Sequence, residues 1–344
     1  MITRRMALQN SVLAGGAALV AWGIPALGRS AENIVTLHGA GSTFSAPLYK
    51  KWIEAYQRDH AQVSLIYDAV GSGEGVTRFT AGSIDFGATD ILPGDVVLAG
   101  ARNGAIPVPV TAGMIVLAYN LPGLAGPLKL PRDVYSGIFS GKITQWNDPA
   151  IQKANPGLAL PKKDIAVVVR QDSSGTTAAF TRHLVVIGSG WHATGSGEGY
   201  DIDWPAAAMD GRGNEGVSSK IKISDGSIGY VEYGFAKRLG LQMATLENSA
   251  GHFVAPTEEG GRAALAAAEN FFTADPPGDA AYPITTFSWL LLHKKYADQK
   301  KEGALKDWVN WGLTTGQTFA SSLGYIPLPA ETAALARRTL DSLS

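Results

Sequence analysis

Three short apolar segments near the start of the chain are each followed by a polar loop rich in glycine, serine or threonine. The segments are 34–37, 63–70 and 84–88, and apolar residues at helical spacing follow the first two loops. This order of strand, loop and helix predicts a mainly parallel α/β sheet. In such sheets ligands bind beyond the carboxyl ends of the strands, where these loops fall.

The rest of the 344-residue chain continues the alternation and is long enough for two lobes. We expect a helix from Pro131, strands over 165–169 and 228–231, a helix from Thr176 and a buried strand over 284–293. The tail over 300–343 is expected to be helical. The apolar segment 106–120 contains two prolines and a glycine, so it is predicted as strand, turn and strand, crossing between the lobes.

The N-terminus has the pattern of an export signal. Arg4 and Arg5 precede an apolar run over 12–24, and small residues follow at 26–28. This pattern predicts a twin-arginine signal peptide over 1–28, since the run is short and interrupted for a membrane anchor. Its removal leaves 27 basic and 30 acidic side chains, and no later run of 18 apolar residues occurs.

Charge and cysteine content exclude several classes of site. Lysine and arginine number 29 against 30 acidic residues, so no basic field exists to hold a nucleic acid. The absence of cysteine excludes disulfides, thiolate metal sites and a lipoprotein anchor. The six histidines show no metal-ligand spacing, so we expect neither a metal nor a cofactor.

Four polar segments at the joints of the predicted strands carry the donors that an oxyanion needs. They are 39–47, 70–79, 85–90 and 170–184. Amides at helix N-termini and serine or threonine hydroxyls bind anions, glycine permits close approach, and arginine adds a two-pronged charge. Serine and threonine also form ordinary helix caps. Four such segments in one chain favour an oxyanion site.

Two carboxylates refine this prediction. Asp90 ends an apolar segment, and Asp172 lies two residues from Arg170. An acceptor-only carboxylate tolerates an anion that brings a proton, as phosphate does at neutral pH, and repels sulfate. The alternative for Asp90 is a helix cap or a loop carboxylate. We expect Asp172 to position the Arg170 guanidinium and to neutralise part of its charge.

Catalytic and nucleotide motifs are absent or incomplete. The segment 137–143 is one residue short of a P-loop, and no serine or threonine follows its lysine. The loop at 39–41 lacks the third glycine of a dinucleotide fingerprint, and 71–73 is not a hydrolase nucleophile elbow. We therefore expect a protein that is not an enzyme.

A set of ordered motifs extends from about Thr36 to near the C-terminus. They are GAGSTF (39–44), VGSGEGV (70–76), DFGATD (85–90), GIFSGKITQWNDPAI (137–151), IAVVVRQDSSGTTAAFT (165–181), GNEGV (213–217), SIGYVEYGFAK (227–237) and PITTFSWLLLHK (283–294). Through these motifs the chain resembles the periplasmic phosphate-binding proteins of bacterial high-affinity phosphate ABC transporters.

The resemblance implies a phosphate-binding shell. Asp90 would take the phosphate proton, Arg170 would bind the anion and pair with Asp172, and the remaining residues would donate amides or hydroxyls. The implied donors are Thr43, Phe44, Ser72, Ser174, Gly175 and Thr176. Two positions depart from the family pattern. Ser42 stands where alanine is common, and Glu74 adds an acid beside the second loop.

The resemblance also implies a two-lobed periplasmic binding protein of type II-like fold, with a ligand cleft between lobes joined by two crossing strands. Lobe 1 would comprise 33–113 plus 282–344 and lobe 2 would comprise 114–281, with crossings near 112–117 and 283–287. Such a receptor is a periplasmic monomer that delivers inorganic phosphate to an ABC permease in the inner membrane. The alternatives are a receptor for sulfate or molybdate, a phosphate-ester hydrolase, and a surface or adhesion protein.

Overall fold

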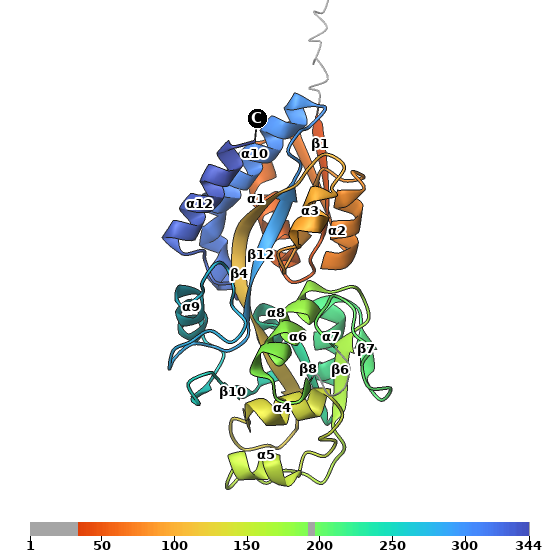
Figure 1. Cartoon of the computed structure of the whole chain (residues 1–344), viewed down its shortest axis with the longest axis vertical. Helices are drawn as coiled ribbons and strands as arrows, with labels where there is room; N and C mark the ends of the chain where they lie inside the picture. The colour runs from red at the N-terminus through yellow and green to blue at the C-terminus, as the bar shows by residue number, and fades with distance from the viewer. Residues whose placement is uncertain (1–33, 192–196, 344) are drawn as a thin grey trace, which may run out of the picture. The chain divides into compact units, whose positions relative to one another are not determined.

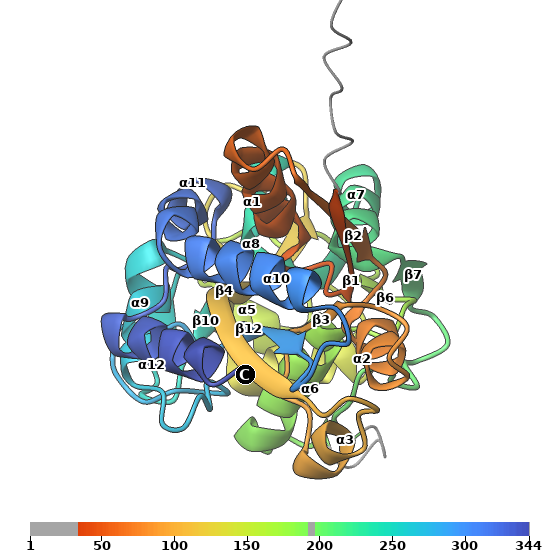
Figure 2. The ribbon, with the colours of Figure 1, turned by 90° about the horizontal axis from the view of Figure 1, so that it is seen from above.

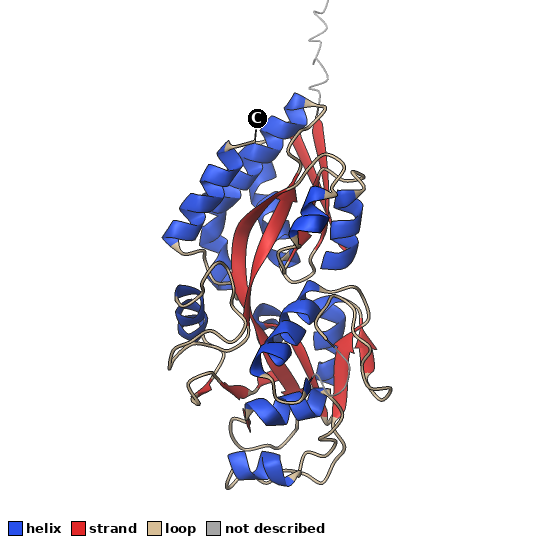
Figure 3. Cartoon of the chain, viewed as in Figure 1, coloured by secondary structure: helices blue, strands red, loops and turns tan. Residues whose placement is uncertain are grey.

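The computed structural model describes residues 34–191 and 197–343, all of which belong to one compact unit. The predicted signal segment 1–28 lies outside the described residues. Helices and strands alternate along the chain (Figure 3), as the apolar spacing predicts. None of the described helices combines the length and apolar character needed to cross a bilayer.

A curled, mixed sheet forms the frame, with the order β2-β1-β3-β12-β4-β8-β6-β7, and β9 pairs with β4. One end is parallel and holds the three strands predicted from the first apolar segments: β1 (Val35–Gly41), β2 (Val63–Ala69) and β3 (Phe86–Thr89). β12 (Thr285–Leu292) runs antiparallel to both β3 and β4 (Ile106–Asn120). The predicted parallel arrangement therefore does not extend to the centre of the sheet.

The other end of the sheet is again parallel between its outer strands. These strands are β8 (Ser227–Glu232), β6 (Ala166–Arg170) and β7 (Met209–Gly211), whereas the short β9 (Gln242–Met243) pairs antiparallel with β4. A separate small sheet joins β5 (Lys129–Leu130), β10 (Thr245–Glu247) and β11 (Phe253–Val254). The sheet thus has two parallel ends, which meet at β4 and β12 (Figure 1).

The prediction of a break within 106–120 is wrong, because β4 is one continuous strand. Its first half pairs with β12 up to Met114, and its second half pairs with β8 from Ile115. On the side away from β12, residues 106–111 have no partner strand within the described chain. Proline is tolerated at such an edge, because no partner strand requires its missing amide hydrogen. The pairing of β4 with β12 is irregular at one point, where the register shifts between Ser288 and Trp289.

Helices cover both ends of the sheet. Around the first end lie α1 (Ala46–Asp59), α2 (Ser72–Thr80), α3 (Asp95–Ala99), α10 (Gln299–Leu313), the 3₁₀ helix η2 (Thr315–Phe319), α11 (Ala320–Leu323) and α12 (Ala330–Asp341). The remaining helices are α4 (Arg132–Phe139), α5 (Pro149–Ala154), α6 (Gly175–Ile187), α7 (Gly213–Ile223), α8 (Tyr233–Arg238) and α9 (Glu258–Ala266). α10 contacts both α1 and α12 (Figures 1 and 2).

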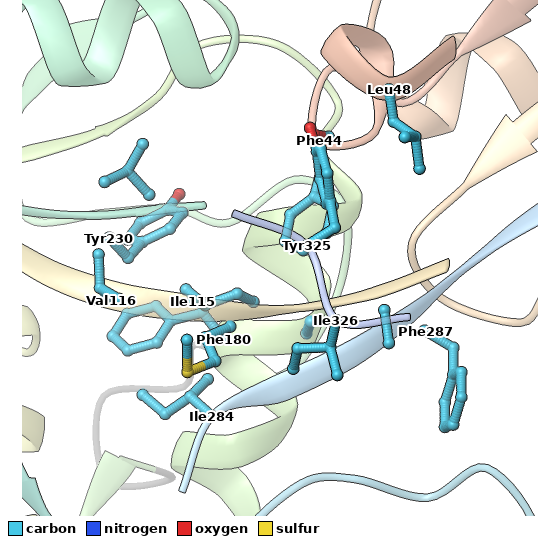
Figure 4. Close-up of a cluster of buried hydrophobic side chains, with 14 of the residues drawn as sticks. Phe44, Leu48, Ile115, Val116, Phe180, Tyr230, Ile284, Phe287, Tyr325 and Ile326 are labelled. Carbon is cyan, nitrogen blue, oxygen red and sulfur yellow. The ribbon is translucent and has the colours of Figure 1, made fainter. Parts of the chain in front are cut away.

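Large aromatic side chains fill the core and fix the loops that precede the helices. Trp52 of α1 is fully buried, and its indole Nε1 donates to the carbonyl of Gly316 at 2.8 Å. Phe44 and Tyr325 lie together in the cluster of Figure 4, with ring centroids 6.1 Å apart. The Tyr325 hydroxyl donates to the Phe44 carbonyl at 2.6 Å. Because buried aromatic pairs add to the energy of area burial, this packing holds the loop before α1 in place.

Candidate functional site

Two helix N-termini and the end of β3 converge on one buried point. Gly71 precedes α2 with φ +101°, and Ser174 precedes α6 in an extended conformation. Gly175 opens α6, and a Cβ built on it would lie 2.8 Å from Oδ2 of Asp90. Only glycine allows this approach, so the start of α6 lies directly against the Asp90 carboxylate.

The start of α6 presents amides without partners inside the helix. The first four amides of any helix lack intrahelical acceptors. The Ser174 hydroxyl accepts from the amide of Thr177 at 3.1 Å, and the Ser174 carbonyl accepts from Ala178 at 3.0 Å. The amides of Gly175 and Thr176 therefore remain for another acceptor. Together with the helix dipole they favour an anion.

Asp90 is 1% exposed and is surrounded by hydroxyls. Its Oδ1 accepts from Ser42 Oγ at 2.5 Å and from Ser288 Oγ at 2.9 Å, while its Oδ2 accepts from Ser72 Oγ at 3.3 Å. Burial raises the pKa of Asp90 to about 6, against the opposing effects of these hydrogen bonds and of Arg170. Asp90 is not a helix cap, since α3 is preceded by Gly94.

Arg170 forms a two-pronged pair with Asp172, as the sequence predicts. Arg170 Nε donates to Asp172 Oδ1 at 2.9 Å, and Nη2 donates to Oδ2. Burial alone would raise the pKa of Asp172. The hydrogen bonds and charge of Arg170, with the Gly213 amide at 2.8 Å, outweigh burial and lower that pKa. Arg170 Nη1 donates to Thr176 Oγ1 at 3.2 Å, so the guanidinium also reaches the start of α6.

The two ends of the sheet also meet through direct hydrogen bonds around this point. Asn214, the second residue of α7, donates from Nδ2 to Thr43 Oγ1 and to Thr176 Oγ1, both at 3.1 Å. The amide of Gly73 donates to the Ser173 carbonyl at 3.1 Å. These contacts join the loops before α1 and α2 to those before α6 and α7, so the donor groups enclose one space.

All nine residues predicted from the sequence therefore lie around one region of the molecule. Ser72, Asp90, Arg170, Ser174, Gly175 and Thr176 are buried there, Phe44 is buried next to Thr43 in the first loop, and Thr43 and Asp172 are partly buried. Glu74 is half-exposed and pairs with Arg78, with 2.7 Å between Oε1 and Nε, so it points away from the cluster.

Three residues at this site were not singled out as ligands in the sequence. Asn214 lies in the GNEGV motif, and its glycine-rich setting before a helix is the only signal. Ser288 lies within an apolar segment whose sequence indicates only a buried core strand. Ser42 adds its hydroxyl to Asp90, and its position in the first polar loop could have suggested this.

A groove of about 440 Å³ opens beside the cluster. The residues that line it include Thr43 and Asp172, together with Lys50 of α1 and Arg212, which precedes α7. Within the described residues no group of three or more histidine, aspartate or glutamate side chains is arranged to hold a metal ion. The site thus consists of hydroxyls, amides, one arginine and two carboxylates.

The chain is similar to known proteins both in sequence and in fold. The model of the PBP superfamily domain matches residues 28–315. The phosphate-binding protein PstS of Pasteurella multocida is 39% identical over 304 residues, which cover 86% of this chain and 87% of that one. PstS of Methanocaldococcus jannaschii is 36% identical, over 88% of this chain and 84% of that one.

Solved structures agree with the fold. A high-affinity periplasmic phosphate-binding protein (PfluDING), solved with phosphate, has a TM-score of 0.71 at 21% identity and covers 88% of this chain and 93% of its own. A putative phosphate ABC transporter substrate-binding protein from Clostridium perfringens, also with phosphate, has a TM-score of 0.65 at 17% identity and covers 86% of this chain and 100% of its own. The predicted two-lobed α/β fold is confirmed. The chain belongs to the PBP superfamily and, within it, to the family of PstS phosphate-binding proteins.

Proposed function

We propose that the protein is an extracytoplasmic receptor that binds inorganic phosphate between its two lobes and delivers it to the permease of an ABC importer. The observation that carries this proposal is that the Asp90 carboxylate lies directly against the start of α6. A buried acceptor carboxylate lies against unpaired helix amides, with Arg170 beside them. An anion held there must satisfy donors on one side and an acceptor on the other.

Protonated phosphate meets both demands. Its unprotonated oxygens accept from the amides of Gly175 and Thr176, from the hydroxyl of Ser72 and from Arg170. Its hydroxyl donates to Asp90, which in its ionised form can accept hydrogen bonds but cannot donate one. Sulfate has no proton at neutral pH, so its oxygens would face a carboxylate of like charge. The assignment of Thr43, Phe44 and Ser174 to the same shell is part of the proposal.

We infer that the lobes are residues 33–113 plus 282–344 and residues 114–281. The change of partner along β4 supports this division, because β12 pairs with it up to Met114 and β8 pairs with it from Ile115. The hinge would then lie where β4 and β12 pass between the lobes. Closure around the anion would form the Asn214–Thr43 and Gly73–Ser173 hydrogen bonds.

The receptor is proposed to act in the periplasm as a monomer, after export by the twin-arginine route, and without a cofactor or catalytic activity. The serines of the site support a binding role. Ser42, Ser72 and Ser288 donate to Asp90, and Ser174 caps α6. A serine nucleophile instead requires a neighbouring general base.

Equilibrium dialysis of the purified protein against radiolabelled phosphate tests the proposal. The protein is first freed of ligand by unfolding and refolding. We expect micromolar or tighter binding by the parent and loss of at least two orders of magnitude for Arg170→Gln. The control Arg262→Gln alters a half-exposed arginine that pairs with Glu258 on α9, and it should bind as the parent does. Equal binding by all three proteins would refute the assignment of the site.

Two further measurements distinguish the alternatives. Binding of sulfate or molybdate with the same affinity as phosphate would identify a general oxyanion receptor. Release of a chromogenic alcohol from a phosphate ester, lost in Arg170→Gln, would identify a hydrolase. Absence of binding and turnover in a folded sample would favour a surface protein built on the same fold.

A further inference from the structure

The two oxygens of the Asp90 carboxylate lie in different environments. Oδ1 accepts two hydrogen bonds, from Ser42 at 2.5 Å and from Ser288 at 2.9 Å. Oδ2 accepts one long bond, from Ser72 at 3.3 Å, and lies on the side of Gly175 and the start of α6. Oδ2 is therefore the oxygen directed toward the anion.

The hydroxyl protons of the two serines are directed by their surroundings. Ser42 Oγ accepts from the amide of Ser45 at 3.2 Å, which leaves its own proton for Asp90. Ser288 Oγ lies 3.0 Å from Ser45 Oγ and 3.5 Å from the Tyr49 hydroxyl, and either can donate to it. Because a carboxylate oxygen only accepts, the Ser288 proton goes to Asp90.

We propose that Ser42 and Ser288 are a pair of positioning residues that hold Oδ1 of Asp90 and keep the carboxylate ionised, so that Oδ2 selects a protonated oxyanion over a fully ionised one. This inference rests on the proposed function and names what sets its selectivity. Ser42 and Ser288 belong to opposite ends of lobe 1 in the sequence, and both are fully buried.

The need for these hydroxyls follows from the burial of Asp90. Burial disfavours its charged form, and few cations oppose that effect. The charged and titratable groups whose fields reach Asp90 from the surrounding elements are Arg170, Glu232, Tyr49, Tyr67, Tyr200 and Tyr325. Only Arg170 among them is a cation. Hydrogen bonds from Ser42 and Ser288 therefore supply the largest stabilisation of the charge.

Protonation of Asp90 would remove its selectivity against a fully ionised anion. A protonated carboxyl group can donate to an oxygen of sulfate, so sulfate would no longer meet a like charge. Phosphate would still bind, because the proton shared between it and Asp90 can sit on either partner. The ratio of sulfate to phosphate affinity, and its dependence on pH, thus reports the state of Asp90.

The test is calorimetric titration of the purified, ligand-free protein with phosphate and with sulfate between pH 5 and pH 8. We compare the parent with Ser42→Ala and with the double variant Ser42→Ala/Ser288→Ala. Loss of one hydrogen bond to a buried charge should increase the sulfate-to-phosphate affinity ratio about tenfold at neutral pH. The pH below which sulfate binds should rise by about one unit per serine.

Ser218→Ala is the matched control, since Ser218 is also buried but donates to the carbonyl of Glu215 on α7. It should leave the ratio and its pH dependence unchanged. If the double variant fails to fold, Ser42→Ala alone still tests the proposal, because it removes one of the two hydroxyls that bind Asp90 and leaves Ser288 in place. A purely structural role would lower the affinities for both anions together and would not move the pH dependence of sulfate binding.

The outcomes separate this inference from the function on which it rests. A parent that prefers phosphate, with variants that gain sulfate binding, supports both. A parent that prefers phosphate, with folded variants of unchanged ratio and pH dependence, overturns the role of Ser42 and Ser288 alone. A parent that binds no phosphate overturns the proposed function and this inference with it.

Discussion

Replacement of Asp172 by asparagine separates the stability of the empty receptor from its affinity for an anion. In the parent the Arg170 side chain is 2% exposed, and its main partner is Asp172, which is 12% exposed. Asparagine has one oxygen, so it cannot accept from Nε, from Nη2 and from the Gly213 amide as the carboxylate does. Its amide group would instead face a guanidinium donor, and the buried charge would lose its counterion.

Removal of one partner of a buried ion pair costs about 3–5 kcal/mol. Because Asp172 retains some solvent contact and asparagine keeps one acceptor, we expect about 3 kcal/mol. At about 2.1 cal/mol/K of unfolding entropy per residue, that loss corresponds in a chain of this size to a decrease in melting temperature of roughly 4–5 °C. Phosphate would return a counterion to Arg170. The stabilisation by saturating phosphate should therefore be larger in Asp172→Asn than in the parent.

Differential scanning calorimetry with and without phosphate measures both quantities. Asp225→Asn is the control, because Asp225 forms an exposed pair with Lys163 and its loss should cost less than about 1 kcal/mol. An empty Asp172→Asn protein as stable as the parent would refute the view that Asp172 balances a buried cation. A variant that gains less stability from phosphate than the parent does would refute that view as well.

Three further predictions follow from the site. Asp90→Asn should lower the ratio of phosphate to sulfate affinity about tenfold to a hundredfold, since asparagine can donate to either anion, and an unchanged ratio in competition dialysis would remove Asp90 from its role. Gly175→Ala should weaken phosphate binding by about tenfold or more, because its Cβ would lie 2.8 Å from Asp90 Oδ2. Unaltered affinity by titration would show that α6 does not approach the anion. Burial raises the pKa of Glu232 to about 8 and that of Asp90 to about 6, so the folded chain binds these protons more strongly than the unfolded chain. These two groups should therefore lower the free energy of unfolding as pH rises from about 4 to about 8. Thermal melts of ligand-free Glu232→Gln should show a weaker decline than the parent, and identical slopes would contradict the assigned shift.

The sequence was informative where function depends on local pattern. The strand-to-helix joints, the start of α6 and the Arg170–Asp172 pair all involve residues close together in the chain. Their hydrogen-bonding capacity can be read from residue type and spacing, and the structure brings them together as expected. The role of each as a phosphate ligand stays a prediction.

The features of the site and of the fold that could not be predicted from the sequence depend on contacts between segments that are distant in the chain. Ser288 reaches Asp90 across 198 positions, and its apolar neighbours conceal it within a buried strand. Asn214 bridges Thr43 and Thr176, which lie 171 and 38 positions away from it in the sequence. The prolines of β4 suggested a break, because the edge position that tolerates them is set by the order of strands and not by local sequence.

The most direct test of the central claim is calorimetric titration of the ligand-free protein at neutral pH, with phosphate and sulfate in separate experiments. The site described here predicts micromolar or tighter binding of phosphate and no measurable binding of sulfate. Equal binding of both anions would contradict the claim that an ionised, buried Asp90 selects the protonated ligand.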